Sequence, residues 1–161
     1  MLTGWNLDNS GIKSRAVSLH IIKDFFKNEK RLSKIITSHI KKHPSLNQAD
    51  KKNITFMSKG VIRFKTHLDM YVENFYHGKM HKLNRTALNL LRMGIFQIKF
   101  MDNVPNYAAV STTVQIAKTM DKKLSNTINA ILREIIRSKS ENMIPQNIGS
   151  ANYAKYYSHP K

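Results

Sequence analysis

Residues 83–118 read LNRTALNLLRMGIFQIKFMDNVPNYAAVSTTVQIAK, and this stretch decides the fold. From Ala87 to Met101 nearly every residue is apolar, and the aliphatic side chains recur at helical spacing. A helix that is apolar on almost every side is enclosed by other helices, because no face of it favours water. The segment is too short, and its Arg92 and Lys99 are too polar, for a membrane span. We therefore predict a central, buried helix in an all-α domain.

Most of the remaining chain shows amphipathic periodicity of the helical kind. Six further helices are predicted at about residues 13–26, 29–42, 48–64, 67–76, 107–120 and 124–137. Asn84 is expected to cap the central helix, and Pro105 to fix the turn that follows it. Gly94 costs that helix roughly 1 kcal/mol relative to Ala, so we expect it to admit the backbone of a neighbouring helix. Strand-like alternation and internal repeats are absent from the sequence. The prediction is an all-α fold of about seven helices.

A chain of 161 residues forms one domain of ordinary size. Residues 1–11 are interpreted as a loose leader and residues 12–137 as the folded domain. Residues 138–161, rich in Asn, Ser and Tyr, are interpreted as a linker or tail. The N-terminus has no charged segment leading into an apolar run, so it is not a signal peptide, and a cytoplasmic location is expected.

Charge is the most unusual property of the sequence. Twenty-seven Lys and Arg residues stand against ten Asp and Glu, which gives a net charge of +17 and a pI near 10.2. Such a field attracts polyanions, namely RNA, DNA or an anionic membrane surface. Charge and size together favour a nucleic acid over a membrane. The alternative is a basic shift shared by a whole proteome.

Several kinds of chemistry are excluded for this chain. It has no cysteine, so it contains no disulfide, no thiolate zinc site and no cysteine nucleophile. Its six glycines occur singly, so no glycine-rich cofactor loop is encoded. Two histidine pairs are spaced four residues apart, His39 with His43 and His77 with His81. Neither has the glutamate of a zincin motif or an evident third ligand, so no metal site is predicted. We predict neither a catalytic residue nor a cofactor here.

Basic residues at helix starts are the remaining functional signal. Lys118, Lys122 and Lys123 cluster just before and at the start of the last predicted helix, where free backbone N–H groups also favour an anion. The alternative for any single lysine is a solvated basic face. The candidate RNA-binding residues are Lys13, Arg15, Lys118, Lys122, Lys123, Asn126 and Arg133.

Three other charged residues are interpreted as structural. Arg63 and Asp69 are expected to form an ion pair between two helices. Arg92, within the apolar central helix, is expected to be a buried cation whose partners satisfy it.

A series of short motifs runs through the domain. G-x-x-R followed by L-D spans residues 60–69, and L-R-x-G-x-x-Q spans residues 91–97. V-P-x-x-A-A-V spans residues 104–110, and N-A-x-L-R spans residues 129–133. In this order the motifs resemble the NusB-like helical domain, although Ser111-Thr112 replace the Asn-Glu pair often found after A-A-V. The resemblance implies two small helical bundles packed together, and RNA binding through basic residues of the first helix, here Lys13 and Arg15.

Within that family, the G-x-x-R and L-R-x-G-x-x-Q motifs are more similar to the N-terminal domain of rRNA cytosine-C5 methyltransferases of the RsmB (Fmu/Sun) type. Tyr157-Ser158-His159-Pro160 also resembles the S-H-P-x-W-L that begins the next domain of those enzymes. This resemblance implies a noncatalytic module that recognises 16S rRNA. It would be joined in cis to a C-terminal methyltransferase domain that uses S-adenosylmethionine.

Two alternatives remain open. The resemblance also fits a free-standing antitermination factor that binds boxA-type RNA together with a ribosomal-protein partner. A helical interaction scaffold whose charge is incidental is the third hypothesis.

Overall fold

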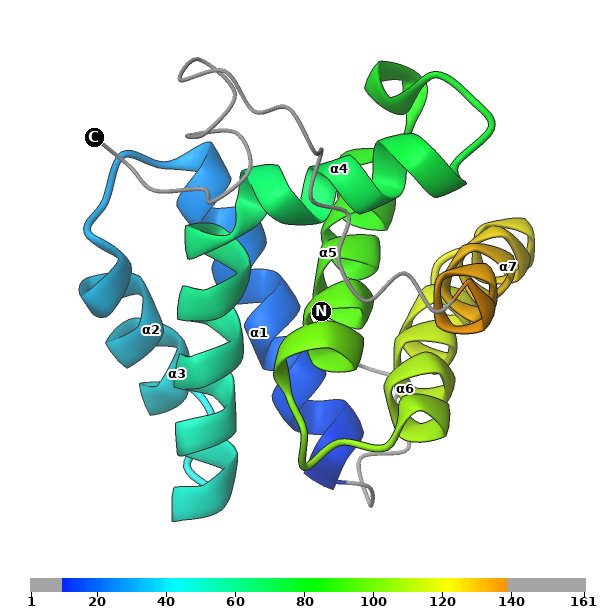
Figure 1. Ribbon diagram of the computed structural model, residues 1–161. Helices are drawn as coiled ribbons and strands as arrows, with labels where there is room; N and C mark the ends of the chain where they lie inside the picture. Colours follow the sequence, from blue (N-terminus) through cyan, green and yellow to red (C-terminus); the bar gives the residue numbers. More distant parts are fainter. Residues whose placement is uncertain (1–9, 139–161) are drawn as a thin grey trace.

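The computed structural model describes residues 10–138, which are helical with short connections (Figure 1). The elements are α1 Ser10–Lys27, α2 Leu32–Lys41, α3 Gln48–Arg63, α4 Lys65–Phe75, the 3-10 turn η1 Met80–Lys82, α5 Arg85–Phe100, α6 Asn106–Lys118 and α7 Lys122–Arg137. No strand occurs in this part of the chain, and none of its helices is long and apolar enough to cross a membrane. The all-α prediction is confirmed, and each predicted helix is present with its ends moved by a turn or less.

α5 is the central helix, as predicted. It packs against α1, α3, α4, α6 and α7, and Figure 1 shows it in the middle of the bundle. Every residue from Leu90 to Gln97 is buried. The Asn84 side chain caps the helix by accepting a hydrogen bond from the Thr86 N–H at 2.8 Å, also as predicted. Burial on all sides follows from the unbroken apolar run, because α5 has no polar face to turn toward water.

Two apolar clusters divide the core. The smaller cluster lies among α1, α2 and α3 and contains Val17, Ile21, Ile35, Ile36, Leu46 and Ile54. The larger lies around α5 and takes residues from α1, α3, α4, α6 and α7. α1 contributes to both because successive residues project about 100° apart on a helix: Ile21 faces the small cluster and Ile22 the large one. This division corresponds to the two small bundles that the sequence resemblance implies.

Two glycines allow close packing around α5. A Cβ at Gly94 would lie 2.7 Å from Cδ1 of Leu132 in α7. The predicted close approach is therefore present, but the neighbour is a side chain rather than a backbone. A Cβ at Gly60 would lie 2.0 Å from the ring of Phe96, so Gly60 lets that ring lie directly against α3.

The buried ion pair of the fold joins α4 to α5. Arg92 donates from Nε to Asp69 Oδ1 at 2.6 Å and from a terminal nitrogen to Asp69 Oδ2 at 2.9 Å. A third donor of Arg92 bonds Asn89 Oδ1 at 2.8 Å. Arg92 is thus a satisfied buried cation, as predicted. The predicted pairing of Asp69 with Arg63 is wrong, because Asp69 lies on the side of α4 that packs against α5, whereas Arg63 ends α3 in an exposed position.

Candidate nucleic-acid interface

The last two helices form a basic groove between them. α6 and α7 are joined by a short turn and pack together, and their outer faces enclose a groove of about 590 Å³. Three of the predicted residues line this α6–α7 groove, namely Lys118, Asn126 and Arg133, and Arg137 lines it too. None of its lining residues is acidic. The groove therefore presents three cations to a ligand without a competing carboxylate on its walls.

Polar and aromatic groups complete the α6–α7 groove. Arg133 donates from Nε to Asn129 Oδ1 at 3.0 Å, which fixes the direction of the guanidinium on the face of α7. Tyr107, at the first turn of α6, also lines the groove and is 78% exposed. An exposed tyrosine supplies a flat surface on which a base stacks and a hydroxyl that hydrogen-bonds.

Sequence reasoning missed Tyr107 and Arg137 as site residues. From the sequence, Tyr107 is predicted only as the first residue of a helix, and Arg137 only as the last residue of the final helix. The signal that could have identified them is that two adjacent amphipathic helices face each other. This arrangement places the end of α7, with Arg137, beside the start of α6, with Tyr107.

The start of α7 differs from the predicted phosphate site. The Asp121 side chain accepts a hydrogen bond from the Lys123 N–H at 2.9 Å and so caps the helix. Its carboxylate already supplies the negative charge that the positive end of the helix dipole favours. Lys122 and Lys123 are exposed and do not line the α6–α7 groove. Their role in RNA binding stays a prediction.

The two predicted residues of α1 make contacts within the protein. Arg15 is half-buried and donates from Nε to Gln97 Oε1 of α5 at 2.5 Å and from a terminal nitrogen to the Gly11 carbonyl at 2.9 Å. Burial lowers the pKa of Arg15 from its usual value. The Lys13 ammonium donates to Ser45 Oγ. Neither residue lines the α6–α7 groove, so their RNA-binding role also stays a prediction.

Two histidines near α1 have lowered pKa values. Burial is the main cause that lowers the pKa of both His20 and His43, and nearby cations lower it further. His39 donates from Nε2 to Asp24 Oδ2 at 3.0 Å, and this bond holds the pKa of the Asp24 carboxyl below its usual value. Within residues 10–138, no three potential metal ligands converge on one point.

The fold and this surface define a class of protein: an all-helical domain with a strongly cationic exterior and an acid-free groove suited to a polyanion. The sequence model of the NusB family matches residues 12–137, which is nearly all of the described chain. The chain belongs to the NusB family.

Relatives of two kinds share this domain. A probable ribosomal RNA small subunit methyltransferase B of Synechocystis sp. is 28% identical over 131 residues, which is 81% of this chain and 29% of that protein. A transcription antitermination protein NusB of Listeria innocua is 36% identical over 78 residues, or 47% of this chain and 61% of that protein. The NusB protein of Acetivibrio thermocellus is 29% identical over 96 residues, 58% of this chain and 66% of that protein. The chain thus matches less than two thirds of the length of each.

Proposed function

We propose that this chain is the RNA-recognition domain of an rRNA cytosine-C5 methyltransferase and that it binds small-subunit (16S) ribosomal RNA through the α6–α7 groove. The observation that carries the proposal is an acid-free groove lined by Lys118, Arg133 and Arg137 on a NusB-family chain of net charge +17. Similarity to a methyltransferase over 81% of the chain supports the enzyme class.

Three kinds of side chain in the α6–α7 groove would contribute to RNA binding. Its cations neutralise backbone phosphates and release the counterions condensed there. Asn126 and Asn129 offer amide donors and acceptors to ribose hydroxyls or base edges, and Tyr107 offers a stacking surface. Phosphate contacts of this kind determine how tightly and in which register the RNA is bound. Any preference for a particular RNA sequence comes from the amide contacts to bases.

The chain itself is proposed to be noncatalytic. It has no cysteine to attack a cytosine ring, and its single glycines form no loop for S-adenosylmethionine. These residues do not fit the cofactor, so both cofactor and methyl transfer are assigned to a C-terminal methyltransferase domain in cis, in the cytoplasm. Sequencing the gene across codon 161 tests this part. A following reading frame with a glycine-rich loop and a catalytic cysteine would support it, and an immediate stop codon would refute it.

Fluorescence anisotropy with a labelled single-stranded fragment of 16S rRNA tests the groove. The double variant Arg133→Glu/Arg137→Glu reverses two groove cations, and Lys34→Glu/Lys41→Glu makes the same charge change on exposed positions of α2. We expect the groove variant to bind at least about tenfold more weakly at moderate salt, because two phosphate contacts are lost. The α2 variant should lose much less. Equal losses would show that only net charge matters and would exclude the groove.

A second candidate function has a specific observation in its favour. The antitermination protein of Listeria innocua is 36% identical to this chain, whereas the methyltransferase of Synechocystis is 28% identical. The Listeria match covers only 47% of this chain. A free-standing antitermination factor would bind boxA-type RNA together with a ribosomal protein. Co-purification of that protein with the full chain at stoichiometric yield would favour this candidate over the methyltransferase.

A further inference from the structure

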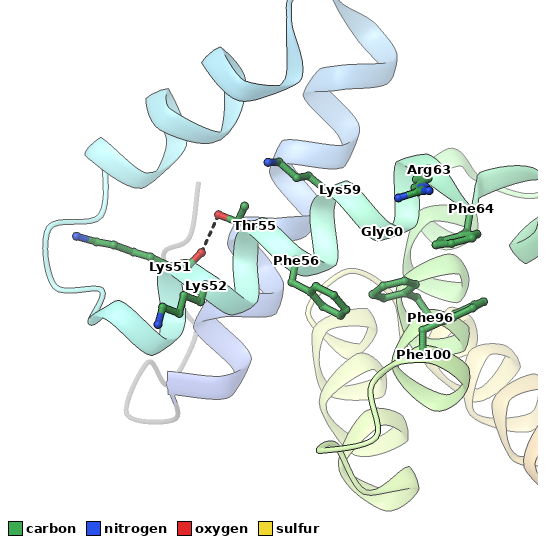
Figure 2. A pocket seen from close by; sticks show the side chains of 10 residues that line it. All are labelled: Lys51, Lys52, Thr55, Phe56, Lys59, Gly60, Arg63, Phe64, Phe96 and Phe100. Carbon is green, nitrogen blue, oxygen red and sulfur yellow. Dashed lines mark hydrogen bonds between the residues drawn. The ribbon is translucent and has the colours of Figure 1, made fainter. Parts of the chain in front are cut away.

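A second basic groove lies on the other side of the core, between α3 and α5 (Figure 2). It has a volume of about 590 Å³ and combines cations with phenylalanines. The residues that line this α3–α5 groove are Lys51, Lys52, Thr55, Phe56, Lys59, Gly60, Arg63, Phe64, Phe96 and Phe100. Like the α6–α7 groove, it has no acidic residue in its lining, but here the floor is aromatic.

The phenylalanines form a continuous row. The ring centroids of Phe56 and Phe96 lie 5.6 Å apart, those of Phe96 and Phe100 5.4 Å apart, and those of Phe100 and Phe64 4.9 Å apart. Phe96 is buried, whereas Phe56 is 53% exposed. Figure 2 shows Phe56 and Phe96 pointing toward one another between the two helices. The exposed ring is therefore held in place by the buried one while more than half of its surface remains accessible.

Cations flank the exposed ring along α3. Lys52, Phe56, Lys59 and Arg63 are spaced four, three and four residues apart, a spacing that places all of them on one face of the helix. The Arg63 guanidinium lies 5.6 Å above the Phe64 ring, which orients it within the groove. Asp50, the one acidic residue of α3, is buried and bonded to Ser14. The positive charges of this face are therefore not neutralised by their own helix.

We propose that the α3–α5 groove binds an unpaired RNA nucleotide, with the base stacked on Phe56 and the flanking phosphates paired with Lys52, Lys59 and Arg63. The inference rests on the proposed function and gives the same RNA a second, single-stranded contact. Aromatic rings beside a cationic track are the usual means of holding single strands, because every base has a face that stacks. An acidic peptide would match the lysines, but its carboxylates would meet the negative face of the Phe56 ring. A duplex keeps its base faces covered.

Substitutions of Phe56 in the full chain test the stacking contact. The probe is a twelve-nucleotide single-stranded RNA carrying 5-iodouridine, with affinity measured by anisotropy and contacts mapped by photocrosslinking. Phe56→Leu keeps an apolar side chain without a ring and is expected to weaken binding about tenfold. Phe56→Trp restores a stacking surface and should bind at least as tightly as the wild type. The crosslink should fall on the peptide that contains Phe56.

Salt titrations should distinguish the contribution of the lysine charges from that of the Phe56 ring. Phe56→Leu removes no charge, so the slope of log affinity against log salt should not change, whereas Lys52→Gln/Lys59→Gln should lower its magnitude by about 1.4. Phe26→Leu, at a partly exposed phenylalanine outside the α3–α5 groove, is the matched control and should leave affinity unchanged. Thermal unfolding of each variant establishes that the fold is retained.

Each outcome decides the proposal. If Phe56→Leu binds like the wild type while Arg133→Glu/Arg137→Glu binds weakly, the inference is overturned and the proposed function stands. If the wild-type chain binds no RNA, both are overturned. If Phe56→Leu weakens binding of a polyglutamate peptide but not of RNA, the groove takes an acidic protein segment and the inference fails.

Discussion

Removal of the Asp69 carboxylate is the sharpest test of the buried link between α4 and α5. Asp69 and Arg92 have side chains only 10% and 7% exposed, and they are joined by two short hydrogen bonds. Asp69→Asn leaves the buried Arg92 guanidinium without a counter-ion. Loss of one partner from a buried pair costs about 3–5 kcal/mol of unfolding free energy. For a domain of this size that lowers Tm by about 10 °C.

Urea unfolding followed by circular dichroism measures this cost. Lys65→Ala is the control, because Lys65 also pairs with Asp69, at 3.3 Å, but its side chain is 43% exposed. An exposed pair of this kind contributes about 0.3–0.5 kcal/mol. Asp69→Leu/Arg92→Met, which replaces both charges, should lose less than the two single changes added together. If Asp69→Asn proves no more destabilising than Lys65→Ala, the assignment of this pair as the buried link between α4 and α5 is wrong.

Three further changes test other parts of the structure. Gly94→Val should destabilise by about 1–3 kcal/mol, measured by urea unfolding, because a side chain there overlaps α7. Arg15→Ala should cost about 1–3 kcal/mol in the same assay, since it leaves the fully buried Gln97 amide oxygen without its donor. The lowered pKa values of His20 and His43 mean that the unfolded chain binds more protons below about pH 6.5. Tm should therefore decrease as the pH is lowered from 7.5 to 5.5, and His20→Gln should make Tm less dependent on pH.

Much of the fold could be predicted from the sequence because the apolar run of α5 identifies it as a buried helix. An apolar run between Asn84 and Pro105 leaves few arrangements other than a helix enclosed by its neighbours. The amphipathic stripes on either side then fix which faces of the other helices turn inward. The buried partner of Asp69 could not be predicted, because it depends on the direction in which α4 leaves α3. Two other basic residues, Arg63 and Lys65, are nearer to Asp69 in the sequence than Arg92 is.

The candidate site was predictable only in part. Lys118, Asn126 and Arg133 lie on two helices that a short turn makes neighbours, so their convergence followed from local sequence. The capping role of Asp121 was missed, although an acidic residue directly before a helix is a common N-cap. The α3–α5 groove was beyond sequence reasoning, because the exposure of Phe56 depends on how Phe96 packs against Gly60 across the core.

Salt-titrated binding of the wild-type chain to a single-stranded 16S rRNA fragment tests the central claim most directly. Three cations line the α6–α7 groove, and each phosphate contact contributes about 0.7 to the slope for a single strand. Log affinity should therefore fall linearly with log salt with a slope of about −2 or steeper. Absence of binding, or an affinity that does not change with salt, would contradict the account.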